Sequence, residues 1–372
     1  MTTTEVRHEL PVVARHAAVR AALADPRLQV PAAPPAPGGT PDNAWFRAGV
    51  ARFANGEAHG RRRAYVVDRL AAVRADALRD AAYEAAATVL AARTTEAAAD
   101  ASAGIRVDVM ADLARAVPLR VLAAALGFEA PDLDTVVDAV TRIAAAYHPG
   151  ADEALVRDAD TAVVVMTALV TALPDTGGED GGDGGDGRAD EAERIGNVIG
   201  ILVQTCDATA GLIGNTAATV LRHGPGAFPG VPVAALVNET LRLDPPVRGT
   251  RRRVAAPLGL ATTDTADEAD ATPEARELPV DTVVVLDFAA ANRDPDVFPD
   301  PDAFDPSRGH TAHLTFGHGL RPCPGADHAL ALACGTLEPL LAGFRLAEPD
   351  AAIVYAPPAN LRVPARLEVT PR

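Results

Sequence analysis

The sequence predicts a mainly α protein with a small β component. Apolar residues recur at helical spacing through long alanine-rich segments, and proline and glycine separate these segments. Strand-like runs are few and short. A chain of 372 residues, 48% of them hydrophobic, is long enough to bury a large core. We therefore expect helices to form most of that core.

The expected helices follow one another along most of the chain. The first ends at Asp25-Pro26, a proline-rich loop at 31–41 follows it, and another helix closes at Gly127. The longest apolar helix covers 195–221 and is expected at the centre of the protein. In chain order, we expect helices at 12–23, 61–93, 107–126, 131–147, 152–173 and 195–221, and strands at 252–258, 282–286, 353–355 and 361–369.

Acidic residues are concentrated in two polar segments. The net charge is −16, and residues 175–193 and 262–277 together account for 12 of these negative charges. The first segment has too few apolar residues to order itself, so we expect a flexible, Gly/Asp-rich loop within a single domain that spans 1–372. A linker between two domains is the competing interpretation. The acidic balance argues against binding to nucleic acid or to an anionic membrane.

The cysteines and the start of the chain indicate the compartment. Cys206, Cys323 and Cys334 are too widely spaced for a disulfide framework or a zinc site, and they suit a reducing environment. The sequence has no run of eighteen apolar residues, and its first residues lack the basic and apolar segments of a signal peptide. We therefore expect a cytoplasmic protein without a membrane span.

One cysteine lies in an unusual setting, the segment Phe316-Gly-His-Gly-Leu-Arg-Pro-Cys323-Pro-Gly325. Its glycines permit backbone angles and close contacts that a side chain would prevent, so the loop can fold beneath a flat ring system and direct amides at the sulfur. A lone cysteine is most often a small buried apolar residue. The glycine pattern and the apolar helix that follows favour instead a thiolate ligand for haem iron, which donates electron density to the metal.

This segment resembles the haem-binding signature of the cytochrome P450 family, and the resemblance extends from about Leu10 to Val369. It implies the cytochrome P450 fold, a single domain shaped like a triangular prism. It also implies that Cys323 ligates the iron of haem b, with Phe316 and Gly325 beside the cofactor.

A second family motif lies upstream of the cysteine. Glu239 and Arg242 are three residues apart on one helix, so they share a face and can pair. A proline-rich segment downstream ends at Arg308. In the family, residues at these places form a buried Glu–Arg–Arg network behind the haem. We expect this triad to be structural, since a buried charge cluster is better suited to fixing one geometry than to adding stability.

The resemblance also implies partners for the two haem propionates. His59 and Arg63 match the family's His-x-x-x-Arg pair at the start of a helix, and Arg253 and Arg321 match two further cationic partners. Each arginine taken alone would be interpreted as a solvated surface residue.

The helix on the oxygen side departs from the family pattern. The family acid is Asp207, but Ala208 replaces the threonine that normally follows, and Gln204 occupies a position that is usually small. Proton delivery then needs another group. Thr209 can supply it if the helix bulges by one residue, or the substrate's own hydroxyl or amine can. We therefore name Asp207, Thr209 and Gln204 as the catalytic residues.

These observations lead to a functional hypothesis. The chain is expected to be a monomeric haem-thiolate monooxygenase that oxidises a small organic molecule in bacterial secondary metabolism, using O2 and two electrons from a ferredoxin or flavodoxin. Val247, Arg248 and Asn360 are placed at the substrate by analogy with the family. Oxidative coupling of aromatic rings through C–C, C–N or C–O bonds is the alternative within this class. A non-catalytic haem-binding or recruitment protein is the alternative outside it.

Overall fold

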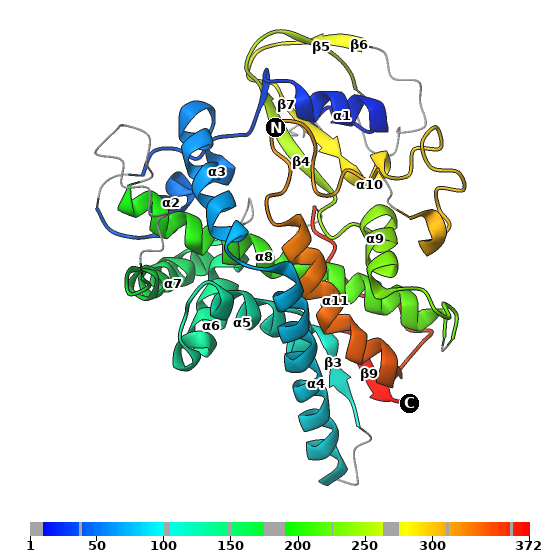
Figure 1. The fold of residues 1–372 in the computed structure, drawn as a ribbon. Helices are drawn as coiled ribbons and strands as arrows, with labels where there is room; N and C mark the ends of the chain where they lie inside the picture. Colours follow the sequence, from blue (N-terminus) through cyan, green and yellow to red (C-terminus); the bar gives the residue numbers. More distant parts are fainter. Residues whose placement is uncertain are drawn as a thin grey trace, which may run out of the picture.

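The computed structural model describes residues 10–36, 39–99, 105–147, 151–174, 190–224, 226–262, 275–309, 312–357 and 360–372. Helices dominate these residues, and small sheets accompany them (Figure 1). The α-helices are α1 His16–Ala24, α2 Asn43–Gly49, α3 Gly56–Ala71, α4 Ala75–Ala99, α5 Ala116–Ala125, α6 Leu133–Ala145, α7 Glu153–Thr171, α8 Glu191–Arg222, α9 Val233–Leu243, α10 Phe288–Ala291 and α11 Ala326–Gly343. Single helical turns of other types are η1 Ala51–Phe53, η3 Ala130–Asp132 and η5 Pro306–Arg308, and η2 Val109–Ala114 is a π-helix. The strands are β1 Val12–Val13, β2 Leu28–Gln29, β3 Val107–Asp108, β4 Gly249–Val254, β5 Leu258–Ala261, β6 Ala275–Leu278, β7 Val283–Asp287, β8 Phe344–Leu346 and β9 Glu368–Pro371.

Two long predicted helices are interrupted in the structure. The segment 61–93, predicted as one helix, belongs to α3 and α4, which are separated at residues 72–74. The segment 107–126 consists of β3, the π-helix η2 and α5. An alanine-rich pattern favours helix throughout both segments, so the breaks come from tertiary packing and not from local propensity.

The central helix α8 starts earlier than predicted. Asp190 caps it, since its side chain accepts a hydrogen bond from the Glu193 amide at 2.7 Å. Residues 190–193 of the predicted acidic loop therefore belong to the cap and first turn of α8. The rest of that loop, 175–189, lies outside the described residues.

The largest sheet has the strand order β1-β7-β4-β2. Strand β4 pairs antiparallel with β7, with Gly249 opposite Asp287 and Arg253 opposite Val283. The predicted strands at 252–258 and 282–286 thus correspond to β4 and β7 with shifted ends. This sheet and α1 lie at one end of the molecule, whereas most helices lie below and beside them (Figure 1).

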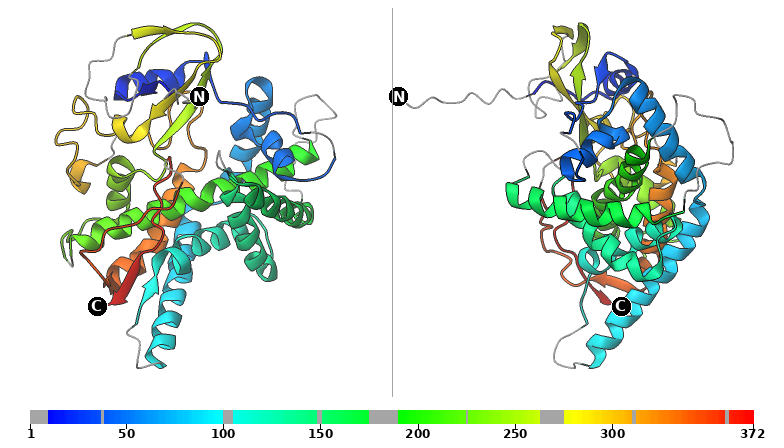
Figure 2. Two further views of the ribbon diagram at one scale, coloured as in Figure 1. Left: turned by 180° about the vertical axis from the view of Figure 1, so that it is seen from behind. Right: turned by 90° about the vertical axis from the view of Figure 1, so that its left-hand side faces the viewer.

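Helix α8 crosses the whole molecule, from α2 and α7 on one side toward α9 on the other (Figures 1 and 2). By length and composition it could cross a membrane, but most of its apolar stretch is buried inside the protein, as in the core helix of a soluble fold. Helix α11 packs against α8 and lies alongside α4. The segment before α11 therefore comes to the centre of the molecule.

Helices α4 and α11 approach each other closely at one glycine. A Cβ atom added to Gly335 in α11 would lie 2.2 Å from the carbonyl oxygen of Arg79 and 2.9 Å from Cβ of Ala82, both in α4. Only glycine permits this approach without displacing a helix. The contact sets the position of α11, the helix that follows the cysteine loop.

We expect the Gly335→Ala substitution to lower the free energy of unfolding by about 2 kcal/mol, because overpacking would force α4 and α11 apart. Urea denaturation followed by circular dichroism measures the effect. Gly343→Ala in the same helix is the matched control, because an added Cβ there meets no atom within 4 Å. Equal stability of the Gly335→Ala and native proteins would contradict the close approach.

Candidate active site

The loop from Phe316 to Gly325 is closed by a hydrogen bond from the Cys323 amide to the Phe316 carbonyl at 2.7 Å. Gly317 and Gly319 have φ angles of 74° and 66°, which L side chains rarely adopt. A Cβ added to Gly319 would also lie 2.7 Å from the backbone of α1. Gly325 differs from this expectation, because its φ of −106° is open to any residue. Two of the three glycines are therefore required by the backbone.

The Cys323 side chain is exposed, whereas the other two cysteines of the chain are buried. Protein atoms nevertheless crowd the thiol. Burial raises the pKa of Cys323, and the Gly325 amide and the charges of Arg63 and Arg52 oppose that shift. The thiol is therefore reached by solvent although protein atoms surround much of it.

The structure brings Glu239, Arg242 and Arg308 together in one network. Arg242 donates from Nη2 and Nε to the two carboxylate oxygens of Glu239 at 2.7 and 3.0 Å. Both side chains are fully buried, with exposed fractions of 0% for Arg242 and 1% for Glu239. Arg308 donates from Nε to Glu239 Oε1 at 3.3 Å. Arg242 has further N–H groups, and in a buried pair of this kind backbone carbonyls must accept hydrogen bonds from them.

The same network reaches the cysteine loop through backbone contacts. The remaining donors of Arg242 bind three carbonyls of the segment after α10, one of them the Asn292 carbonyl at 3.1 Å. The Asn292 side chain donates to the Thr315 hydroxyl at 2.9 Å and accepts from the Leu314 amide at 2.7 Å. Thr315 immediately precedes Phe316. The buried charges therefore help to fix the start of the loop.

Four arginines gather around this loop, from η1 (Arg52), α3 (Arg63), β4 (Arg252) and the loop itself (Arg321). Burial lowers the pKa of Arg321 to about 10, and the charges of Arg63 and Arg52 add to the shift. Burial likewise lowers the pKa of Arg252 to about 10, helped by Arg52 and Arg321. Within the part of the chain that the structure describes, none of the four forms an ion pair with a carboxylate; their hydrogen bonds go to carbonyls and neutral side chains.

His59 in α3 adds a neutral donor to this cluster. Burial lowers its pKa to about 4, and the charges of Arg321 and Arg63 contribute. The imidazole is therefore uncharged at neutral pH. It can donate one hydrogen bond without adding to the repulsion among the arginines.

The structure revises one predicted residue of this cluster. Side chains alternate across β4, so Arg252 is buried toward the cluster, while Arg253 pairs with Asp281 on a half-exposed face. We therefore replace Arg253 with Arg252 as the cationic partner from this strand. Because residues 251–253 are all arginine, the sequence alone does not show which of them lies on the buried face of β4.

The middle of α8 is a regular α-helix. Gln204 Nε2 donates to the Gly200 carbonyl at 2.9 Å and Thr205 donates to the Ile201 carbonyl at 2.8 Å. The described helix has no bulge, and the Thr209 side chain is buried, with 2% exposed. The structure therefore removes the reason for placing Thr209 at the reacting oxygen.

Two other residues of α8 differ in their surroundings. Asp207 accepts a hydrogen bond from Arg115, which joins η2 to α5, at 3.2 Å between Nε and Oδ1. Gln204 is exposed although it lies midway along a buried core helix. Its side chain is accessible to solvent, as the Cys323 side chain is.

The three predicted substrate residues lie on adjacent segments. Val247 forms a β-bridge with Leu361, and the Arg248 amide donates to the Asn360 carbonyl at 2.9 Å. Arg248 is partly buried, and its charge acts on the carboxyl group of Asp244, whose pKa burial raises. The structure thus brings the three together, but it directs the charge of Arg248 partly to Asp244.

Sequence analysis missed one residue that ties the loop to α3. His328 in the first turns of α11 has its Nε2 atom 3.0 Å from the Leu70 carbonyl and 2.9 Å from the Val73 carbonyl, at the end of α3. Two acceptors at one nitrogen fix Nε2 as the protonated atom. Arg63 in the same helix donates to the Pro322 carbonyl at 2.7 Å. Helix α3 is therefore attached to both sides of Cys323, and no spacing in the sequence predicts the histidine contact.

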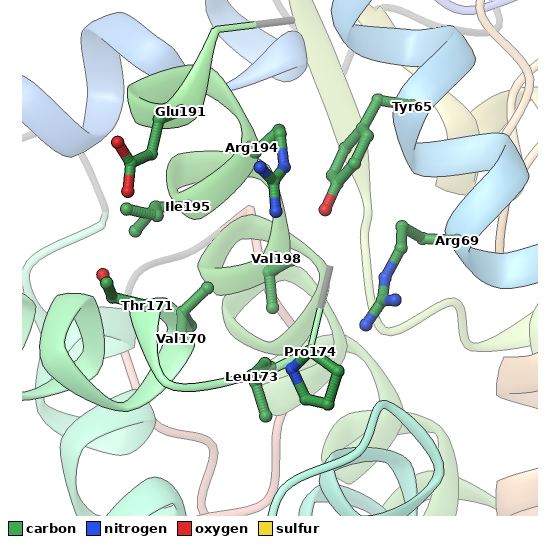
Figure 3. Close-up of a pocket in the computed structure, with 10 residues that line it drawn as sticks. All are labelled: Tyr65, Arg69, Val170, Thr171, Leu173, Pro174, Glu191, Arg194, Ile195 and Val198. Carbon is green, nitrogen blue, oxygen red and sulfur yellow. The ribbon is translucent and has the colours of Figure 1, made fainter. Parts of the chain in front are cut away.

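A separate small cavity of about 40 Å³ lies between α3, the end of α7 and the start of α8. In Figure 3 the hydroxyl of Tyr65 and the guanidinium groups of Arg69 and Arg194 point toward this space. It is large enough for ordered water but not for an organic substrate. None of its lining residues belongs to the cysteine loop or to β4.

The described residues fit a haem group. A haem needs an accessible cysteine sulfur on a rigid loop and positive partners for two carboxylates. The exposed Cys323 on its closed loop provides the first, and the four arginines without carboxylate partners in the described residues provide the second. A mainly α fold with this site and with a buried Glu–Arg–Arg network defines a haem-thiolate protein.

Comparisons with known proteins agree with this class. A family model described as Cytochrome P450 matches residues 233–354. Cytochrome P450 107B1 of Saccharopolyspora erythraea is 33% identical over 205 residues, which are 52% of this chain and 42% of the relative. The erythromycin C-12 hydroxylase of the same organism is 36% identical over 147 residues, 37% of this chain and 32% of that protein. The matched segments thus span less than half the length of these curated relatives.

Solved structures match over nearly the whole chain. P450BioI, in complex with a fatty acid-ligated acyl carrier protein, superposes with a TM-score of 0.78 at 20% identity, covering 97% of this chain and 91% of that one. CxnD, described as a P450 for C–S bond formation in chuangxinmycin biosynthesis, has a TM-score of 0.70 at 21% identity, covering 97% and 89%. Identities this low show the fold alone. Together these findings support a bacterial cytochrome P450, a family whose members hold haem b through a cysteine thiolate.

Removal of Arg242 is expected to be severe. The Arg242→Ala protein should lose about 4 kcal/mol of unfolding free energy, because the buried Glu239 carboxylate would be left without its partner, and it should be purified without haem. Arg157→Ala, which removes an exposed arginine that pairs with Glu153, is the control and should cost less than about 1 kcal/mol. Full haem content in purified Arg242→Ala protein would refute the structural role.

The low pKa of His59 predicts a pH dependence for the haem-free protein. In the folded chain burial lowers the His59 pKa to about 4 from its ordinary value of 6.5, so between these values the unfolded chain binds a proton that the folded one does not. Stability should therefore fall as the pH falls from 6.5 toward 4. Urea midpoints measured across this window should fall less in the His59→Gln protein; identical slopes in both proteins would argue against the shifted pKa.

Proposed function

We propose that this protein is a haem-thiolate monooxygenase that oxidises a small organic molecule with O2 and two electrons. One observation carries the proposal: an accessible thiol lies on a rigid loop among four arginines that lack carboxylate partners in the described residues. The names of relatives are consistent with it, because several are hydroxylases or oxygenases. When bound, the haem supplies an iron centre that activates O2.

Each part of the site has a role in holding that cofactor. Cys323 would ligate the iron, and the Gly325 amide, which lowers the pKa of the thiol against the effect of burial, would stabilise the thiolate. Arg63, Arg252 and Arg321 would pair with the propionates, with His59 as a neutral donor. Phe316 lies beside the cysteine, because its carbonyl accepts from the Cys323 amide.

The oxygen side must deliver protons without the usual threonine. Insertion of one oxygen atom into a C–H bond reduces the other atom to water, and this step consumes two protons and two electrons. Asp207 is anchored by Arg115, and Ala208 has no hydroxyl to order a water chain. Gln204, exposed in the middle of α8, is the polar side chain positioned to orient a water or a substrate hydroxyl there.

Oxidative coupling remains the second proposal within the same class. The missing threonine hydroxyl favours a reaction that needs no inserted oxygen. One solved structure carries a description of this kind, since CxnD is described as a P450 for C–S bond formation. A curated relative, biflaviolin synthase of Streptomyces coelicolor, is 41% identical over 90 residues. A non-catalytic haem protein is disfavoured, because such a chain would have no need of the complete cysteine loop and Glu–Arg–Arg network.

The remaining features of the proposal concern the cellular setting. We propose a ferredoxin or flavodoxin as electron donor, a monomeric state, a cytoplasmic location and a role in bacterial secondary metabolism. Relatives named for erythromycin and nocardicin C chemistry support the last point.

A carbon monoxide difference spectrum tests the haem-thiolate assignment. The reduced native protein should show the long-wavelength Soret band of thiolate-ligated haem, and Cys323→Ser should abolish it, because a serine hydroxyl is not deprotonated as readily as a thiol. Cys334→Ser, at a buried cysteine within α11, is the control and should retain the band. An unchanged band in the Cys323→Ser protein would overturn the assignment.

Reaction with 18O2 separates the two reaction types. Label in the organic product supports oxygen insertion, whereas coupled products without label support the second proposal. The Ala208→Thr protein should waste fewer electrons as hydrogen peroxide if oxygen is inserted, because the hydroxyl would restore an ordered proton path.

A further inference from the structure

Asn55 lies immediately before α3, at the position where an asparagine usually caps a helix. Its side chain accepts no hydrogen bond from the first turn of α3, although asparagine is one of the preferred capping residues. The side-chain amide binds the Val30 backbone instead. Nδ2 donates to the Val30 carbonyl at 3.0 Å, and the Val30 amide donates to Oδ1 at 3.3 Å. The side chain of Asn55 therefore serves a contact outside its own helix.

The same amide oxygen holds Arg321 of the cysteine loop. Arg321 Nη2 donates to Asn55 Oδ1 at 2.9 Å and to the neighbouring Ala54 carbonyl at 2.6 Å. The contacts with Val30 settle which end of the amide carries the oxygen, because a backbone N–H can only donate and a backbone carbonyl can only accept. Asn55 thus presents its acceptor to the guanidinium group.

The segment that carries both acceptors is itself attached to α8. Asn197 of α8 is only 1% exposed, and its side chain accepts from the Ala51 amide at 2.9 Å and donates to the Gly49 carbonyl at 3.1 Å. A Cβ atom added to Gly200, three residues further along α8, would lie 3.1 Å from Cγ1 of Val50. The segment is therefore held at its start as well as at its end, so the acceptors of the guanidinium have little freedom to move.

Both acceptors are uncharged, and this matters for the ligand that Arg321 is expected to bind. In the part of the chain that the structure describes, only Nη2 of the guanidinium donates to the protein, which leaves Nε and Nη1 for a ligand. An aspartate in place of Asn55 could accept the same hydrogen bond, but its charge would pair with the guanidinium. A neutral amide fixes the orientation of Arg321 and leaves its full positive charge for an anion.

We propose that Asn55 is a positioning residue for haem binding, which orients the Arg321 guanidinium toward a propionate without neutralising it. This inference rests on the proposed function, in which Arg321 pairs with a haem propionate, and it adds a residue that acts through Arg321. Loss of the Asn55 amide should therefore weaken haem binding while Arg321 is present. It should have little further effect once the guanidinium has been removed.

A double-mutant cycle on the haem-loaded protein tests this role. The readout is the rate at which haem transfers to apomyoglobin, added in excess as the acceptor. Asn55→Ala should lose haem about tenfold faster than the native protein, because Arg321 would no longer be held toward the propionate. In the Arg321→Gln background the same substitution should change the rate by less than about twofold. A general loss of packing around Asn55 would instead have the same effect in both backgrounds.

The Asn55→Asp protein tests the importance of a neutral acceptor. The carboxylate would keep the hydrogen bond but pair with Arg321, so haem should again dissociate about tenfold faster. The reduction potential of the haem should also fall, because a negative charge near the iron disfavours the reduced state. Ala92→Asp adds the same charge at an exposed position of α4 and should change neither value. This comparison can be made even if Arg321→Gln is isolated without haem.

The positioning role is refuted if Asn55→Ala loses haem at the native rate, or if its effect is equally large in the native and Arg321→Gln backgrounds. A native dissociation rate and a native potential in Asn55→Asp would refute the need for a neutral acceptor. All these results leave the thiolate Soret band of the native protein intact. Failure of the proposed function would instead show as the absence of that band.

Discussion

The active site depends on the buried ion pair between Glu239 and Arg242. Two charges without access to water need every donor and acceptor satisfied, and the chain meets this need by folding the segment after α10 around Arg242. Asn292 in turn donates a hydrogen bond to Thr315, the residue immediately before the cysteine loop. The pair contributes little net stability compared with apolar packing, but it admits one arrangement of the loop. The geometry of Cys323 follows from that selection.

Contiguous motifs explain how much the sequence could predict. Short contiguous segments contain the cysteine loop, the Glu239 and Arg242 pair and the helical spacing of apolar residues. In such segments the local backbone geometry determines where the side chains lie. Arg252 and His328 belong to another category. The side of β4 that Arg252 faces depends on pairing with β7, and the acceptors of His328 come from the end of α3, far away in sequence. Only the tertiary fold defines such contacts.

Some helix boundaries can likewise be predicted from local sequence, whereas others depend on tertiary contacts. Asp190 ahead of α8 is a capping residue that a local pattern can identify, yet the glycine-rich composition around it favoured a longer loop. The break between α3 and α4 has no comparable signal, because alanine-rich sequence is compatible with a continuous helix. Packing of α4 against α11, where Gly335 permits a close approach, fixes the direction of α4 after the break. Long-range contact, not propensity, ends α3.

The two sides of the site are under different constraints. The cysteine side is held by charges, glycines and the attachment of α3 through Arg63 and His328, so its geometry tolerates little change. On the α8 side, Gln204 is exposed with its amide bonded to the Gly200 carbonyl, and Ala208 has no polar side-chain group. The first side determines which cofactor fits. The second leaves the choice of substrate and reaction to a few side chains.

The triple arginine of β4 has a consequence for folding fidelity. A one-residue slip of a strand exchanges its two faces, and such a slip would normally replace the buried charge by a different side chain. Here both neighbours of Arg252 are also arginines, so a slipped strand would still present a guanidinium to the site. The slip would instead be destabilising at Gly249, where an added Cβ lies 2.7 Å from the Leu286 carbonyl, and at the fully buried Val254. Steric fit at the two ends of β4 therefore sets the register, and electrostatics alone would not distinguish the correct sheet from its misaligned form.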